Sequence, residues 1–102
     1  MNAALAMTSR QRRLLEDLLR EHIPGVKVWA FGSRAQGRAR PESDLDLAVF
    51  SEPEQAAGVS RLREALEESN LPFRVDVLIW RGIPESFQKN IADTHVVLVE
   101  IP

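Results

Sequence analysis

The apolar residues near the start of the chain recur with the period of a helix. Within residues 14–19, four leucines stand at i, i+1, i+4 and i+5, which places them on a single helical face. Thr8 with Gln11 three positions later has the form of a capping box, and a Pro-Gly pair further on supplies a stop signal. This pattern predicts a helix that opens at Thr8 and ends near His22.

Four later segments have the composition or the alternation of strands. Val26–Phe31 alternates between two apolar faces and is broken by Gly32, while Asp44–Phe50 alternates polar and apolar residues. Phe73–Trp80 is rich in valine and isoleucine, and His95–Ile101 is largely β-branched. We therefore expect four short strands.

Two more helices are expected between these strands. Ser51 and Glu54 stand at the spacing of a second capping box with a proline between them, and Asn70 marks the end of that helix. Pro84 suits the first turn of a short helix before the last strand. The resulting order, α-β-β-α-β-α-β, predicts one α/β (α+β) domain over residues 1–102 with a small mixed β-sheet.

Composition narrows the classes of function. Hydrophobic residues make up 44% and charged residues 27% of the 102 positions, which is typical of a globular protein. No apolar run approaches the roughly 20 residues of a membrane-spanning helix. The net charge of −2 argues against stable nucleic-acid binding, which relies on a basic surface. The absence of cysteine excludes disulfides and thiolate zinc sites and, with no secretory segment, predicts a cytoplasmic protein.

Two aspartates two positions apart are the first candidates for chemistry. Asp44 and Asp46 fall on an expected strand, so their side chains leave the same face with Cα atoms roughly 6.6 Å apart. Carboxylates at this spacing can bind Mg²⁺, or two Mg²⁺ ions roughly 3.5–4 Å apart, and protein-bound Mg²⁺ is commonly shared with substrate phosphates. For such a pair taken alone, a solvated sheet face is the alternative.

A third aspartate strengthens the case for a cation site. Asp76 interrupts an otherwise apolar strand, where a carboxylate is costly unless it is paired or binds a cation. If the second and third strands are neighbours, Asp76 completes a triad with Asp44 and Asp46. The alternative is a salt bridge from Asp76 to Arg74 or Arg81.

A glycine-serine pair directly follows the first strand. Gly32 allows the backbone to approach a phosphate closely, and Ser33 adds a hydroxyl donor. Arginine side chains match phosphate oxygens, so Arg34, Arg38 and Arg40 could neutralise a triphosphate. The alternative for each arginine is a solvated loop position.

Together these motifs resemble the DNA polymerase β-like nucleotidyltransferase superfamily. The string GSRAQGRARPESDLDLAV, which starts at Gly32, is similar to the minimal, MNT-type branch of bacteria and archaea. The resemblance is strong from Val26 to about Trp80, and the remaining elements agree in order and length. It implies a small mixed β-sheet flanked by helices, with the active site at one edge of the sheet.

The resemblance also implies roles for individual residues. Gly32 and Ser33 match the nucleotide-binding turn, to which we add Arg34. Three aspartates match the residues that bind metal and carry catalysis: Asp44, Asp46 and Asp76. The implied cofactor is Mg²⁺, with two ions, and the implied substrate is ATP or another nucleoside triphosphate. An acceptor hydroxyl would attack the α-phosphorus and pyrophosphate would leave.

The MNT branch resembles the antitoxin half of HEPN/MNT toxin–antitoxin pairs. The implied activity is adenylylation of a hydroxyl, typically of a tyrosine, on a helical HEPN partner. This chain contains no tyrosine, so a partner must supply one. Two alternatives remain open, a non-catalytic antitoxin that neutralises its partner by contact and a small-molecule, antibiotic-type nucleotidyltransferase. The sequence also leaves open whether the protein forms a homo-oligomer or a hetero-oligomer.

Overall fold

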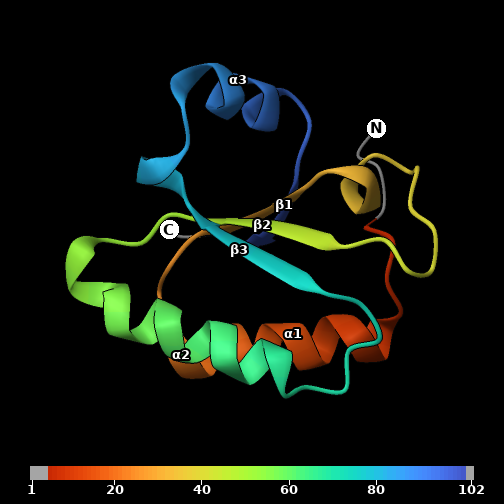
Figure 1. The fold of residues 1–102 in the computed structure, drawn as a ribbon, viewed down its shortest axis with the longest axis horizontal. Helices are drawn as coiled ribbons and strands as arrows, with labels where there is room; N and C mark the ends of the chain where they lie inside the picture. Colours follow the sequence, from red (N-terminus) through yellow and green to blue (C-terminus); the bar gives the residue numbers. More distant parts are fainter. Residues whose placement is uncertain (1–4, 101–102) are drawn as a thin grey trace.

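The computed structural model describes residues 5–100 of the chain. Over this range helices and strands follow one another in the order expected from the sequence (Figure 1). The elements are α1 (Ser9–His22), β1 (Val28–Phe31), β2 (Leu45–Val49), α2 (Ala56–Glu67), β3 (Val75–Ile79), α3 (Glu85–Asp93) and β4 (Val96–Val99). Short 3₁₀ turns include Ser33–Ala35, which directly follows the glycine at the end of β1.

The described strands form a mixed sheet in the order β3-β2-β1-β4. Strand β1 runs antiparallel to β2 and β4, whereas β2 and β3 are parallel. The parallel pair is possible because α2 provides the long crossover that such strands need. In this register Asp46 lies opposite Asp76 on one side and opposite Phe31 on the other. The small mixed sheet predicted from the sequence is confirmed.

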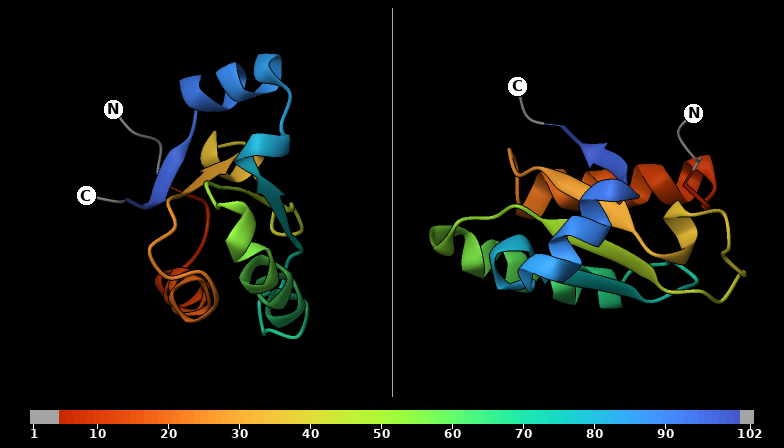
Figure 2. Two further views of the ribbon diagram at one scale, coloured as in Figure 1. Left: turned by 90° about the vertical axis from the view of Figure 1, so that its left-hand side faces the viewer. Right: turned by 90° about the horizontal axis from the view of Figure 1, so that it is seen from above.

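Helices α1 and α2 cover one face of the sheet, and α3 lies over the other (Figure 1, Figure 2). The main core lies between the sheet and the α1–α2 pair. Its most deeply buried members include Leu15, Leu19, Val28, Leu45, Leu47, Val49 and Leu62. Because side chains alternate between the faces of a strand, Asp46 lies on the other face, towards α3. A smaller apolar cluster on that face consists of Phe31, Ala48, Ile83 and Ile91.

Helix α1 begins and ends where the sequence predicts. The Thr8 hydroxyl accepts a hydrogen bond from the Gln11 backbone N–H at 3.0 Å. In return, the Gln11 side-chain oxygen accepts from the Thr8 backbone N–H at 2.9 Å. The predicted capping box is therefore confirmed, and the helix ends at His22.

The turn that leads into α2 is capped one residue later than predicted, and α2 itself begins at Ala56. The capping box is formed by Glu52 and Gln55, whose side-chain oxygen accepts from the Glu52 backbone N–H at 2.6 Å. Pro53 occupies the first position of the 3₁₀ turn that leads into α2. Glu52, the residue before this proline, is the N-cap of the turn, so the predicted box of Ser51 and Glu54 is wrong.

Other element boundaries also depart slightly from the sequence-based expectation. Strand β2 begins at Leu45, where its ladder with β3 begins, so Asp44 precedes the strand. Pro84 is the N-cap of α3 and not a first-turn residue, because its ψ angle of 143° is extended. Ile101, expected in the last strand, lies outside the described residues.

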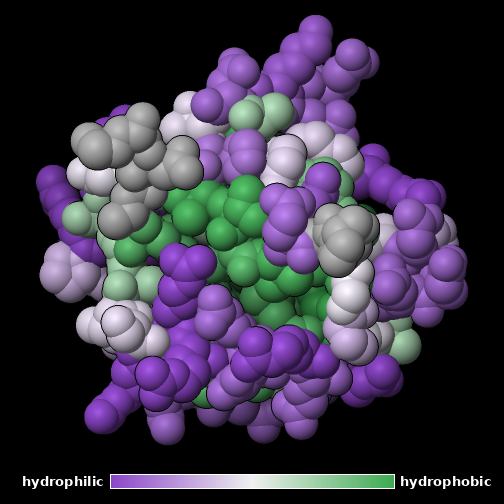
Figure 3. Space-filling view, turned by 180° about the vertical axis from the view of Figure 1, so that it is seen from behind, coloured by the Kyte–Doolittle hydropathy of each residue, from purple (hydrophilic) through white to green (hydrophobic). Residues whose placement is uncertain are grey.

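The side of the molecule that carries β4 and α1 shows an apolar area surrounded by polar residues (Figure 3). Strand β4 is an edge strand of the sheet, and its Val97 is 36% exposed. An open strand edge can take part in contacts with another chain. None of the helices within residues 5–100 has the length and apolar character needed to cross a bilayer.

Candidate active site

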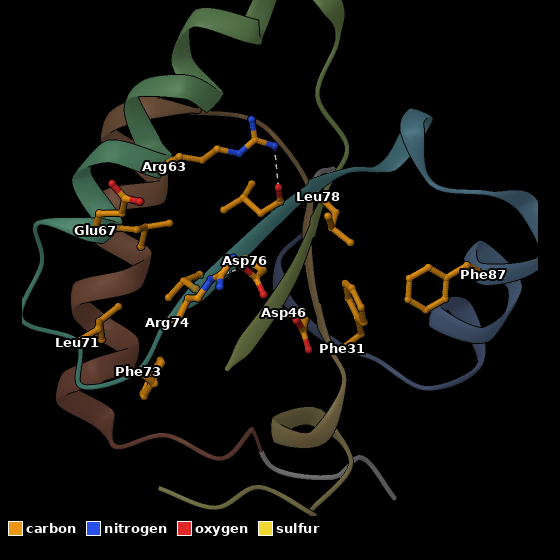
Figure 4. Close-up of a pocket in the computed structure, with 13 residues that line it drawn as sticks. Phe31, Asp46, Arg63, Glu67, Leu71, Phe73, Arg74, Asp76, Leu78 and Phe87 are labelled. Atoms are coloured by element: carbon orange, nitrogen blue, oxygen red, sulfur yellow. Dashed lines mark hydrogen bonds and ion pairs between the residues drawn. The ribbon is translucent and has the colours of Figure 1, made fainter. Parts of the chain in front are cut away.

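The candidate site is built around two aspartates on neighbouring strands. Asp46 of β2 and Asp76 of β3 are register partners in the parallel pair. Adjacent strands lie about 4.8 Å apart, so the two side chains leave the same face of the sheet side by side. Figure 4 shows both residues on these adjoining strands, between α2 and the Phe87 side chain of α3.

Burial and neighbouring charge disfavour the ionised form of Asp46. The pKa of Asp46 is raised, most strongly by burial, then by repulsion from Asp76 and finally by repulsion from Asp44. Each of these effects acts against the carboxylate and in favour of the neutral acid. A cation bound beside Asp46 would offset all of them.

Asp44 lies directly before β2, one residue ahead of the first pair of the ladder, and not within the strand as expected. Its side chain is exposed, and its charge reaches Asp46 as one cause of the raised pKa. The next residue, Leu45, donates its backbone N–H to the Arg74 carbonyl at 2.8 Å, which is where β2 starts to pair with the chain leading into β3. The expectation is corrected because the ladder begins one residue after Asp44.

Asp76 forms the ion pair that the sequence left open as an alternative. Its Oδ1 lies 2.9 Å from Nε of Arg74, whose side chain is 76% exposed. Across residues 5–100, no three carboxylate or imidazole groups come together in a way that could hold a metal ion. The three aspartates therefore do not form a complete metal site by themselves, although the charges of Asp44 and Asp76 both act on Asp46.

The aspartate pair nevertheless fits a hard divalent cation. Mg²⁺ takes oxygen ligands, keeps several waters, and is usually held by one or two carboxylates together with substrate phosphates. Asp46 and Asp76 supply two carboxylates side by side, and their mutual repulsion contributes to the raised pKa of Asp46. These two residues, with Asp44 at the edge, are the ones that could hold Mg²⁺ when a triphosphate supplies the remaining oxygens.

Gly32 lies directly against the Asp46 carboxylate. Its φ angle is +79°, and a β-carbon at this position would overlap Oδ2 of Asp46 and lie 3.3 Å from Cγ. Glycine is required both by the backbone conformation and by the close approach. The turn that starts at Ser33 is thereby held beside Asp46.

Arg34 does not point towards the aspartates, contrary to the role in nucleotide binding expected of it. Its side chain is buried, and its guanidinium donates to backbone carbonyls of Ala6, Arg40, Pro41 and Ser43. A guanidinium whose donors are used in this way is not available to a phosphate. The sequence could not reveal this, because three of the four acceptors lie in an irregular loop.

Asp46 separates two hollows on the surface. A groove of about 1100 Å³ follows the edge of β3 and is lined by Asp76, Leu78 and Phe87 among others (Figure 4). A smaller hollow of about 230 Å³ lies on the α3 side. Its polar lining residues are Gly32, Gln36, Arg38, Asp46, Asn90 and Thr94. Sequence reasoning did not single out the α3 residues, whose only signal was the amphipathic pattern of a short helix.

A mixed sheet with a helix pair on one face, and a glycine-serine turn beside paired aspartates on the other, defines the chain as a nucleotidyltransferase-type domain. The family described as "Polymerase beta, Nucleotidyltransferase" matches residues 14–101. The chain belongs to this family.

Relatives with known descriptions point in the same direction. The chain is 42% identical over 99 residues to "Probable protein adenylyltransferase MntA" of Haemophilus influenzae, covering 96% of this chain and 87% of the relative. A solved structure assigned as a minimal nucleotidyltransferase is 34% identical, with a TM-score of 0.68 over 85% of this chain and 88% of that one. A chain from a complex of a tri-AMPylated Shewanella oneidensis HEPN toxin with an MNT antitoxin has a TM-score of 0.55 at 18% identity. The match covers 91% of this chain and 72% of that one. This last likeness shows the shared fold alone.

Proposed function

We propose that this protein transfers AMP from ATP to a hydroxyl group of a partner protein, and that Mg²⁺ is required. The observation that supports the proposal is the contact of Gly32 with Asp46, the register partner of Asp76. A metal-bound triphosphate needs a turn that binds its anionic phosphates next to a carboxylate pair that binds the cation. The 42% identity to an adenylyltransferase supports adenine as the base.

Each residue of the site has a proposed task. The backbone at Gly32 and the hydroxyl of Ser33 bind the phosphates that leave as pyrophosphate. Asp46, Asp76 and Asp44 hold Mg²⁺, which when bound polarises the phosphates and stabilises their developing charge. Asp76, on the side of the groove, accepts the proton of the acceptor hydroxyl. The acceptor oxygen forms a bond to the α-phosphorus while the bond from that phosphorus to pyrophosphate breaks.

The proposed acceptor is a tyrosine on a HEPN-type toxin, for which this protein would act as the antitoxin. The chain has no tyrosine of its own, so the acceptor side chain must come from another protein. The groove along β3, which Asp76 lines, has a volume of about 1100 Å³, more than a single side chain of a partner needs. The relative named MntA and the fold shared with an MNT antitoxin support this partner class. A cytoplasmic location and the absence of stable nucleic-acid binding remain predictions.

A second candidate function is neutralisation of the partner by contact alone. The Arg74–Asp76 ion pair favours it, since Arg74 neutralises a carboxylate that catalysis would need free. Because Arg74 is largely exposed, this pair is held weakly and can be displaced by a cation. We therefore place catalysis first.

The test is incubation of the purified protein and a HEPN-type toxin with Mg²⁺ and ATP, followed by intact-mass analysis of both chains. The partner is expected to gain the mass of one or more AMP groups. This gain should be lost in Asp46→Asn and in Asp76→Asn, and kept in Asp17→Asn, an exposed aspartate on α1. A partner that binds the wild-type protein and is never modified would establish the contact mechanism instead.

A further inference from the structure

Arg34 is a buried cation whose role the proposed reaction leaves unexplained. It is 5% exposed and, within residues 5–100, forms no ion pair with a carboxylate. A buried charge is costly unless its hydrogen-bonding groups are satisfied. The structure satisfies this one almost entirely with backbone oxygens.

The guanidinium of Arg34 joins two segments of backbone. Its Nε donates to the Ser43 carbonyl at 2.8 Å, and one Nη donates to the Pro41 carbonyl at 2.8 Å and, more weakly, to that of Arg40 at 3.4 Å. The other Nη donates to the Ala6 carbonyl at 2.6 Å, and the Ala6 backbone N–H donates back to the Arg34 carbonyl at 2.9 Å. Only the branched geometry of a guanidinium can satisfy several carbonyls in different directions.

An aromatic ring completes the environment of this guanidinium. The Cζ atom of Arg34 lies 3.9 Å from the ring centroid of Phe73, which comes from the segment leading into β3. A cation over an aromatic face is stabilised by the ring quadrupole. Arg34 also lines a hollow that includes Phe73 and Pro41 and is formed without Gly32, Asp46 or Asp76, so its side chain faces away from the candidate active site.

These contacts connect both ends of the loop that runs from the Gly32–Ser33 turn to Asp44. Arg34 itself belongs to the 3₁₀ turn that starts at Ser33, and its acceptor Ser43 directly precedes Asp44. Residues 36–44, which link this turn to β2, form no helix or strand. The side chain therefore bridges the start of the loop to its end, across nine positions of sequence.

We propose that Arg34 is a positioning residue, which holds the Gly32–Ser33 turn and Asp44 at a set separation and does not contact the nucleotide. The proposal rests on the proposed function for its kinetic consequence. Its structural consequence, an ordered loop over residues 36–44, is independent of any activity. A displacement of about 1 Å at a reacting group can reduce the rate about 100-fold, so loss of this bridge is expected to affect catalysis strongly.

Two substitutions distinguish positioning from direct phosphate binding. Arg34→Lys keeps the positive charge, and lysine remains a good phosphate ligand, but one ammonium group cannot span the separated carbonyls of Ala6, Pro41 and Ser43. Arg34→Met keeps the apolar stem against Phe73 and removes every donor. Arg61→Met, at an exposed position on α2, is the matched control.

The first measurement is amide hydrogen exchange in the loop. The amides of Arg38 and Ser43 are hydrogen-bonded within it, and both Arg34 variants are expected to exchange these protons at least about tenfold faster than the wild type. The second is the steady-state rate of AMP transfer. We expect kcat to fall about 10–100-fold in Arg34→Lys and Arg34→Met alike, while KM for ATP changes less than about threefold.

The outcomes separate the two hypotheses. A tenfold or larger rise in KM with retained kcat and unchanged exchange would make Arg34 a nucleotide ligand, as would full activity in Arg34→Lys. A wild-type protein without transferase activity would refute the proposed function, while the exchange data would still decide whether Arg34 orders the loop. If Arg34→Met fails to fold, Phe73→Leu removes the aromatic face and keeps the donors. This variant is expected to speed exchange by a smaller factor, and unchanged exchange would overturn the proposal.

Discussion

Gly32 and Asp46 lie in direct contact, with the glycine backbone against the carboxylate, although 14 positions separate them in the sequence. The contact exists because β1 and β2 are antiparallel neighbours and Phe31, the last residue of β1, is the register partner of Asp46. The turn that follows β1 therefore lies on the same face of the sheet as the aspartate pair.

This contact makes Gly32→Ala damaging in two ways. A β-carbon would overlap Oδ2 of Asp46, and the positive φ angle would be strained in any residue other than glycine. We expect a loss of stability of about 1–3 kcal/mol and at least a tenfold loss of AMP transfer. Chemical denaturation and a transfer assay on the same preparation measure both.

Gly37→Ala is the matched control for that substitution. Gly37 has a φ angle of +73°, and a β-carbon there would have open space around it. It therefore carries the backbone strain without the overlap. Equal activity losses in the two variants would mean that the close approach of Gly32 to Asp46 has no function.

Asp46→Asn is expected to abolish transfer and to stabilise the protein near neutral pH. The pKa of Asp46 is raised above its ordinary value of 3.8, so the folded protein binds this proton more readily than the unfolded chain. The contribution of Asp46 to stability is then complete below pH 3.8 and is lost as the pH rises through the raised pKa. Asparagine removes the repulsion, so the gain in melting temperature should grow between acid and neutral pH.

The measurement is a series of melting curves from pH 3.5 to 8 for wild type and Asp46→Asn. Asp17→Asn, on the opposite side of the sheet, controls for the loss of a carboxylate at an exposed position. A variant that is less stable than the wild type at pH 7 would show that the Asp46 carboxylate makes a favourable contact in the folded protein.

Mg²⁺ and a nucleotide are expected to stabilise the protein together more than either does alone. The pair of aspartates offers too few oxygens for a complete Mg²⁺ shell, and a triphosphate supplies the others. A ligand that binds only the folded state at 100 times its Kd adds about 2.7 kcal/mol. Melting curves with Mg²⁺, with a non-hydrolysable ATP analogue, and with both would detect this, and identical curves would argue against a nucleotide site.

Gly58→Ala should destabilise the protein although alanine is the better helix former. Gly58 lies in α2 where it passes the end of α1, and a β-carbon would overlap the His22 carbonyl oxygen and lie 3.4 Å from Cγ2 of Ile23. Overpacking of this kind costs typically 1–3 kcal/mol, against about 0.8–1.0 kcal/mol from helix propensity. Denaturation midpoints test the net effect. Gly82→Ala, with open space at its β-carbon, should change stability little.

Much of the fold follows from short-range pattern. Three features depend only on residues close together in the sequence, within a few helical turns or one strand. They are the capping box of Thr8 and Gln11, the leucine face of α1 and the alternation through β2. Such interactions are the same in any fold, so they can be recognised in the sequence. The same holds for the motif that places Gly32 before the aspartates, which indicated the family before any geometry was known.

The tertiary structure decided which of these residues meet and in what state. Strand order makes Asp76 the neighbour of Asp46, and the start of the ladder leaves Asp44 in the loop. Arg34, expected to bind nucleotide, is instead buried among backbone carbonyls. Register, burial and the partner of a charged side chain depend on segments far apart in the chain. The local sequence determined which residue types were available to this site, and long-range packing determined their positions and their hydrogen-bond partners.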